Sequence, residues 1–221
     1  MGKFRDAVQV VIRLIRRKKE QPDLNDASYR EAPFLDEVWW SPNEDEVALI
    51  RHTWPADEDV QVRLGQEILG YILERSKTHK LLFGEIAKHG KKWRQSVAFH
   101  RQATKFNETI DFAVENLSRP RKVERFLFDI GAAHCRLLPI GFKVIHWELW
   151  KPAVMHSMQR YVTGSRFPEM SDEDRRFVLT LWGHVAVYIT RKMFLGFCDA
   201  FAVLDSYLER TGYDVSAIHN S

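Results

Sequence analysis

The chain has 221 residues, of which 45% are hydrophobic, 12% aromatic and 29% charged, and this composition excludes disordered and collagen-like chains. Two cysteines exclude a small secreted domain held by disulfides and favour a reducing, cytoplasmic setting. The net charge is +3, but residues 1–20 carry seven basic and two acidic side chains, which leaves −2 for the remainder. The basic character therefore belongs to the N-terminal segment, and a nucleic-acid-binding protein is not indicated.

Residues 1–20 are expected to form a basic amphipathic helix that lies on an anionic membrane surface, at the inner face of the membrane. Their apolar side chains recur at helical spacing, at Phe4, Val8, Val11 and Ile15. Gly2 is available for myristoylation, although Asp6 stands where the consensus has Ser or Thr. A mitochondrial presequence, a segment that docks on the body or on a partner protein, and a solvated extension remain alternatives. No apolar run reaches the ~18 residues of a membrane span.

The rest of the chain is expected to be all-α, with a linker at 21–40, a folded domain at 41–200 and a C-terminal tail at 201–221. Ser41 and Pro42 predict the start of the first helix, with Ser41 as the cap, and Pro55 ends it. Further helices are predicted at residues 58–75, 79–83, 96–117, 123–137 and 141–161, and from Ser171 onward.

Apolar residues with three- and four-residue spacing predict the buried faces of these helices. In chain order they are Val47, Ile50, Trp54, Leu64, Ile68, Leu69, Ile72, Leu73, Phe99, Ala103, Phe106, Ile110, Ala113, Val114, Phe126, Leu127, Ile130, Val178, Leu181, Trp182, Val185, Ile189 and Met193. Because no heptad repeat is present, the helices are expected to cross steeply around one core, in a fold that can enclose a flat apolar cofactor.

His134 is the histidine with the most apolar surroundings on its helix face. A neutral imidazole on a rigid helix beside an apolar wall can bind haem iron, whereas a hydrogen-bonded core histidine is the alternative. Gln102, Lys105 and Phe106 lie on one helix face upstream and would bring an amide, a cation and a ring to the opposite side of a pocket. A solvated helix face is the alternative for Gln102 and Lys105.

At these residues the chain resembles the globin family. Trp54, residues 65–69 and Phe83 stand at the spacings of the globin first-helix tryptophan, the second helix and the phenylalanine that wedges against the haem. Residues 99–106, with the sequence FHRQATKF, are similar to the globin distal helix, and residues 129–134, with the sequence DIGAAH, to the proximal one. The resemblance covers about residues 44–200, is closest in character to invertebrate, nematode-like globins, and implies a three-over-three helical sandwich.

The resemblance implies that haem b is bound, with His134 as the iron ligand and Gln102 in the distal position. It also implies that Phe83 clamps the haem, that Leu69 and Phe106 line the distal pocket, and that Lys105 meets a propionate. Ile130 and Ile140 complete the expected cofactor-binding residues. The expected ligand is dioxygen or another diatomic gas, for binding, transport, storage or sensing. A haem redox protein and a haem-less, globin-like scaffold are the alternatives.

The glutamine at the distal position predicts a five-coordinate ferrous iron, because a carboxamide is a poor iron ligand. His100 cannot replace it, since two residues along a helix correspond to a rotation of about 200°. Cys135 is turned from His134 by about 100° and is not expected to bind iron. Free, partly buried thiols are the expected state of Cys135 and Cys198, and a redox role or a disulfide between them is the alternative.

Overall fold

The computed structural model describes residues 40–164 and 166–210, so the segment expected at 1–20 and all but the last residue of the linker expected at 21–40 lie outside the described residues. Every element in the described part is helical, which confirms the all-α prediction. The elements are α3 (Glu44–Thr53), α4 (Glu58–Arg75), α5 (Lys77–Leu82), α6 (Gly84–Ala87), η2 (Gly90–Gln95), α7 (Val97–Asn116), α8 (Pro120–His134), η3 (Cys135–Ile140), η4 (Val144–Trp147), α9 (Trp150–Val162) and α10 (Asp172–Arg210).

The helix starts are set by local capping, and one expected cap is wrong. Helix α3 is capped by Asn43 rather than Ser41: the Asn43 side chain accepts from the Glu46 N–H, and the Glu46 carboxylate accepts from the Asn43 N–H. This reciprocal pair satisfies two N–H groups, whereas Ser41 lies too far upstream. Asp57 and Ser96 cap α4 and α7 more simply, because each side chain accepts one backbone hydrogen bond.

Two predicted helices differ from the structure around their glycine and proline residues. Helix α8 begins at Pro120, three residues before the predicted start, because proline at the first helical position gives up no hydrogen bond. The helix predicted at 141–161 begins only at Trp150. Gly141 has a φ of 92°, a left-handed conformation that ends the preceding turn, and only the short η4 forms before α9.

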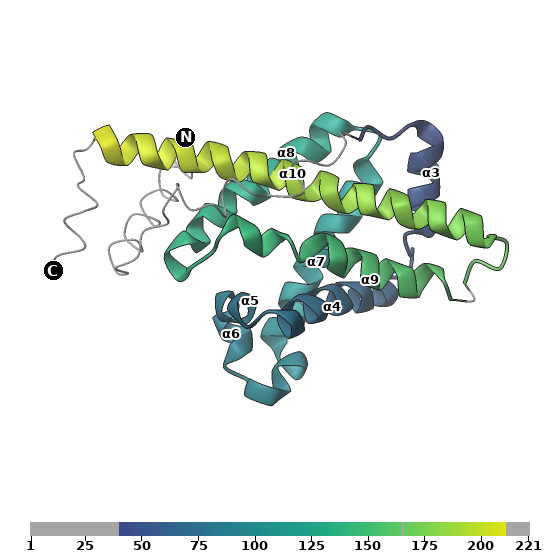
Figure 1. The fold of residues 1–221 in the computed structure, drawn as a ribbon, viewed down its shortest axis with the longest axis horizontal. Helices are drawn as coiled ribbons and strands as arrows, with labels where there is room; N and C mark the ends of the chain where they lie inside the picture. Colours follow the sequence, from purple (N-terminus) through teal and green to yellow (C-terminus); the bar gives the residue numbers. More distant parts are fainter. Residues whose placement is uncertain (1–39, 165, 211–221) are drawn as a thin grey trace.

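The helices form two layers of three (Figure 1). Helices α4, α9 and α10 make one layer, in which α9 packs against both of the others. Helices α3, α7 and α8 make the second: α7 packs on α4, while α3 and α8 pack on α10. The chain thus adopts the expected three-over-three sandwich, and α5, α6 and η2 project from its lower side (Figure 1).

The core follows the apolar faces predicted from sequence. Leu64, Ile68, Ile110, Leu181 and Trp182 are all buried in one cluster between the layers. Two indole N–H groups inside this core are paired. The Trp182 Nε1–H donates to the Thr53 hydroxyl over 3.0 Å, and the Trp54 Nε1–H donates to the Asp111 carboxylate over 2.7 Å. These bonds join the end of α3 to α10 and α7 and satisfy both of these donors.

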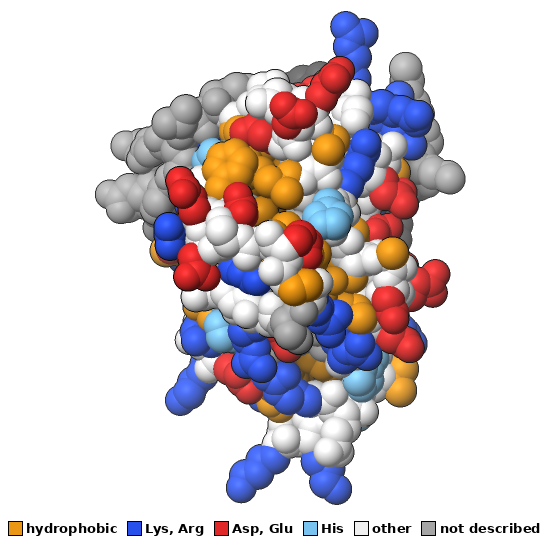
Figure 2. All heavy atoms as spheres, turned by 90° about the vertical axis from the view of Figure 1, so that its right-hand side faces the viewer, with side chains coloured by type: hydrophobic (Ala, Val, Ile, Leu, Met, Phe, Trp, Pro, Cys, Tyr) orange, Lys and Arg blue, Asp and Glu red, His pale blue; other side chains and the backbone are white. Residues whose placement is uncertain are grey.

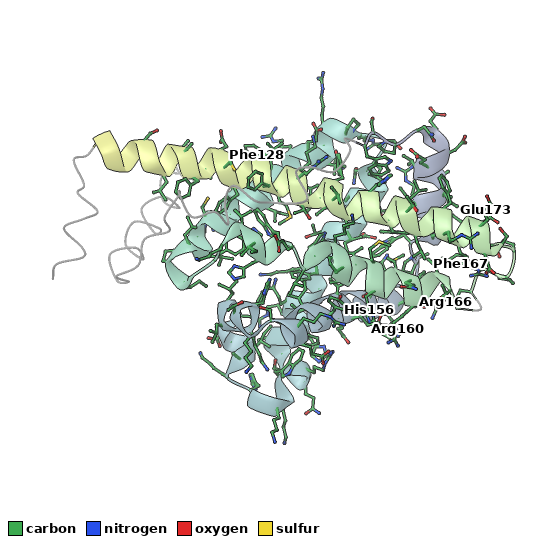
Figure 3. All side chains as sticks on the ribbon, in the orientation of Figure 1. Phe128, His156, Arg160, Arg166, Phe167 and Glu173 are labelled. Atoms are coloured by element: carbon green, nitrogen blue, oxygen red, sulfur yellow. The ribbon has the colours of Figure 1, made fainter. Side chains whose placement is uncertain are left out.

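Helices α8 and α10 approach so closely that only glycine fits at two positions. A Cβ atom on Gly131 of α8 would collide with the backbone of Met193, and one on Gly196 of α10 would collide with the backbone carbonyl of Phe128. Phe128 lies on α8 where the two helices cross (Figure 3). This crossing holds the end of α8, and with it His134, against α10.

Helix α10 continues to Arg210, beyond the domain boundary expected at residue 200. Leu204 is buried there, and Phe201 packs against buried residues that include Phe197. The division of the chain into segments at 1–20, 21–40, 41–200 and 201–221 stays a prediction. No helix among residues 40–164 and 166–210 has the length and apolar character needed to cross a membrane.

Candidate functional site

His134 is the last residue of α8 and is oriented by its own helix. Its Nδ1–H donates to the Ile130 carbonyl over 2.8 Å, because a carbonyl oxygen can only accept. In the neutral ring, the lone pair therefore lies on Nε2. Burial lowers the pKa of His134, although the hydrogen bond to Ile130 opposes the shift. The ring is thus held neutral, in one tautomer and orientation, with Nε2 available as a ligand.

An aromatic cluster supports the His134 ring. The ring centroids of Phe142 and Trp147 each lie 5.3 Å from that of His134. We call the buried residues around these rings the His134 cluster: Cys135, Leu138, Phe142, Val144, Trp147, Phe197 and Ala200. They come from η3, η4 and α10 and from Phe142 between η3 and η4, so several segments fix the surroundings of the imidazole.

Three of the expected haem contacts gather in a second apolar cluster. We call its buried residues the Leu69 cluster: Leu69, Leu73, Ile86, Trp93, Phe99 and Ala103. Phe83 and Phe106 are partly buried and pack against it. Phe106 also contacts the Trp150 ring of α9, at 5.4 Å between centroids. The fold therefore places Leu69, Phe83 and Phe106 together, although they are far apart in sequence.

The polar residues expected on the same side have different environments. Gln102 is partly buried on α7 and makes no hydrogen bond to any residue of the described chain. Lys105 is exposed, which both a position at a pocket edge and a solvated helix face predict. His100 faces α4, where its Nδ1 lies 3.1 Å from the Gln66 amide nitrogen. Of the side chains of Gln102, Lys105 and His100, only that of Gln102 is both partly buried and without a hydrogen-bond partner in the described chain.

The two clusters share no buried residue, and no hydrogen bond or ring contact in the described chain joins His134 to Gln102 or Phe106. A haem group needs an apolar wall on each face and one neutral imidazole Nε2. The His134 cluster and the Leu69 cluster provide walls of this kind. Ile140 is 39% exposed, so the protein covers this large apolar side chain only in part. The residues present therefore fit a haem.

Cys135 and Cys198 are free thiols, as expected, but Cys135 is buried and Cys198 exposed, whereas both were expected to be partly buried. The Cys135 Sγ donates to the Phe197 carbonyl over 3.3 Å, so this thiol points toward α10. Burial, with a smaller contribution from Cys198, raises the pKa of Cys135 to about 12. A thiol with this pKa is a weak nucleophile near neutral pH.

Sequence reasoning missed a pair of histidines beside the His134 cluster. The His79 Nε2–H donates to the His146 carbonyl over 2.6 Å, and the two rings meet edge to face at 4.7 Å. His79 belongs to α5 and His146 to η4, so the pair joins segments 67 residues apart. The His79 Nδ1 is buried without a partner in the described chain. No local periodicity signals such a pair, because it depends on tertiary contact.

The His79 and His146 pair predicts a loss of stability in acid. Burial lowers the pKa of both rings; for His146, burial and the neighbouring His79 lower it from 6.5 to about 4. The unfolded chain therefore binds protons first, and the free energy of unfolding should fall as the pH decreases from about 6.5 to 4. Urea unfolding at pH 7, 6, 5 and 4 measures this slope at constant haem content.

A substitution can separate the contribution of this pair to the pH dependence of stability from the contributions of other titrating groups. His146→Asn retains an acceptor for the Lys143 N–H, which donates to the His146 Nδ1 over 2.8 Å, but cannot titrate. We expect a shallower pH dependence for this variant. His89→Asn changes an exposed histidine and should leave the slope unchanged. Equal slopes in the His146 variant and the native chain would contradict the assignment.

A comparison of the chain with models of known protein families gives a match. The family model described as Globin matches residues 66–186, which include α7, α8 and α9 and the side chains Gln102 and His134. No curated protein matches the chain. The narrower resemblance to invertebrate, nematode-like globins therefore stays a prediction.

Proposed function

Because this chain belongs to the globin family, we propose that it holds haem b through His134 and binds dioxygen or another diatomic gas on the Gln102 side, for storage, transport or sensing. The observation that carries the proposal is the hydrogen bond from the His134 Nδ1–H to the Ile130 carbonyl. This bond directs Nε2 away from its own helix and increases its basicity as an iron ligand.

The chain's own residues would contact the haem on both faces. Ile130, Ile140 and the His134 cluster would cover the side that carries the imidazole. Leu69, Phe83 and Phe106 would cover the opposite side, since they already share one apolar cluster. Lys105, exposed at the edge, would meet a propionate through its ammonium group. The haem supplies the iron and the electronic properties, whereas the protein supplies ligation, orientation and polarity.

Absorption spectra of the purified protein test this function directly. We expect a Soret band in the ferric and ferrous states, and a ferrous spectrum of five-coordinate iron that shifts on addition of carbon monoxide. Spectra of two internal nitrogen ligands would contradict the open sixth position. No Soret band after haem reconstitution would contradict haem binding itself. Slow autoxidation in air would favour reversible gas binding over redox chemistry.

Gln102 would control gas dissociation through its amide N–H. We expect Gln102→Leu, which removes the donor at similar volume, to increase the rate of dioxygen dissociation about tenfold, as for the loss of one hydrogen bond of about 1.4 kcal/mol. Stopped-flow displacement of dioxygen by carbon monoxide measures this rate. The matched control is Gln66→Leu, which removes the amide of a residue on α4 that faces His100 of α7. An unchanged rate in the Gln102 variant would show that its amide does not contact the gas.

The location that we propose is the cytoplasm, where free Cys135 and Cys198 are the expected state. Residues 1–20 would attach the protein to the anionic inner face of the membrane through their basic amphipathic pattern. Deletion of residues 1–20 followed by liposome sedimentation tests this attachment, and undiminished sedimentation would end it.

A further inference from the structure

The folded body has an uneven charge distribution. Residues 76–101 contain seven Lys and Arg and only one acidic residue, Glu85, a formal charge of +6. We call this segment the basic lobe. Since residues 1–20 carry +5 and the whole chain +3, all other residues together carry −8. The value of −2 for the chain after residue 20 therefore conceals a strongly cationic segment.

The basic lobe is a distinct projection of the fold. It comprises α5, α6, η2 and the first turn of α7, and it extends from the lower side of the two helix layers (Figure 1). Figure 2 shows Lys and Arg side chains concentrated over the lower part of the molecule. The cations thus gather at one end of the body and face solvent together.

Most of these cations lack a protein counter-charge. Glu85 pairs with Lys88 at 2.5 Å, and Arg94 pairs with Glu74 of α4 at 2.7 Å. The other exposed cations make no hydrogen bond or ion pair with any residue in the described chain; they are Lys77, Lys91, Lys92 and Arg101. Their charges remain available to an anionic surface.

Two large apolar side chains stand exposed among these cations. Leu81 of α5 is 73% exposed and Val97 at the start of α7 is 71% exposed, more than any other large hydrophobic residue in the described chain. The indole ring of Trp93 is by contrast only 8% exposed and lies under the Lys80 ammonium. Aliphatic side chains surrounded by lysines can enter the outer part of a lipid layer while the ammonium groups meet its head groups.

We propose that the basic lobe docks the protein on an anionic lipid membrane. The exposed charges are mainly lysines, which are depleted from protein interfaces, whereas Arg94 and Trp93, of the residue types typical of such interfaces, are paired and buried respectively. Lysine charge near an anionic lipid surface gains affinity without requiring a specific geometry. The surface is separate from residues 1–20, and its docking does not depend on bound haem.

Vesicle binding by the full chain tests the proposal. We use vesicles of phosphatidylcholine with and without phosphatidylserine. Lys91→Glu/Lys92→Glu should weaken binding to the anionic vesicles at least about 25-fold, since each basic residue near such a surface contributes a factor of about five. Arg160→Glu/Arg176→Glu changes the net charge equally, at exposed positions of α9 and α10, and should bind like the native chain. Equal binding of the native chain and the Lys91/Lys92 variant would overturn the proposal.

A separate variant tests how much the exposed apolar side chains contribute to membrane binding. Leu81→Ser/Val97→Ser should weaken binding about tenfold at constant charge, because the two aliphatic side chains no longer enter the lipid. Phe177→Ser alters an exposed residue of α10 and is the control. Equal binding of the Leu81/Val97 variant and the native chain would overturn insertion of these side chains.

Hydrogen exchange distinguishes the basic lobe from residues 1–20. In the full chain with phosphatidylserine vesicles, peptides from residues 77–97 should gain protection, and this protection should disappear with phosphatidylcholine alone. Protection confined to residues 1–20 would overturn the proposal, as would equal protection by both vesicle types. Haem-free and haem-loaded protein should behave alike, so a failure of haem binding leaves this test intact.

Discussion

We expect His134→Ala to leave the protein without retained haem, so that the Soret band disappears after gel filtration. The substitution removes the imidazole whose Nδ1–H is held by the Ile130 carbonyl, and no other described histidine has this environment. Loss of the proposed iron ligand should weaken haem binding by at least about 100-fold, beyond the 10- to 100-fold typical of outer-shell changes. Haem titration monitored by absorbance measures the affinity.

The control for this experiment is His100→Ala. His100 is exposed on α7 and faces Gln66, so its loss should leave haem content unchanged. Circular dichroism of the His134 variant shows whether the helices persist without the imidazole. Retention of one haem per chain by a folded His134→Ala protein would contradict our assignment of the iron ligand.

We expect Gly196→Ala to cause a large loss of stability, as the same change at Gly131 would, because both glycines lie at the close crossing of α8 and α10. The added Cβ would overlap the backbone carbonyl of Phe128, and a backbone carbonyl cannot rotate away as a side chain can. Helix α8 must move instead, which should cost about 4 kcal/mol of unfolding free energy, at the upper end for an overpacked core. Because His134 ends α8, haem affinity should fall as well. Urea unfolding and haem titration measure the two effects.

Gly183→Ala is the matched control, because it makes the same change in the same helix. A Cβ on Gly183 would lie 3.5 Å from the Met155 Sδ, which is an ordinary van der Waals contact. Alanine is a better helix former than glycine by about 1 kcal/mol, so this variant should be as stable as the native chain or more stable. Similar stabilities of the two variants would contradict the close crossing of α8 and α10.

Helical periodicity and capping predicted most of the fold because they act within a few residues. The helix predicted at 58–75 has those same bounds in α4, and its apolar face is buried. The errors also have local causes. Asn43 competes with Ser41 as a cap and wins through its reciprocal bond with Glu46, and Gly141 interrupts an apolar pattern that otherwise continues a helix.

The candidate site was predictable where its residues share one helix. The register of His134 above Ile130 follows from a four-residue step, and the structure shows the resulting hydrogen bond. The pairing of His79 with His146 was not predictable, since it joins segments that only the packing of α5 against η4 brings together. The charge of the basic lobe can be counted from its sequence, but the exposure of its cations and their lack of ion pairs depend on the fold.

Local patterns in the sequence were enough to predict most of the helices, most of their buried faces, and the residues that match the globin family. These features depend on hydrogen bonds and side-chain spacing within one or two helical turns. Three other features required the packed fold: how closely α8 lies on α10, which aromatic rings hold His134, and which cations lack a partner. Each depends on groups distant in the chain, whose contacts arise when the two helix layers pack together.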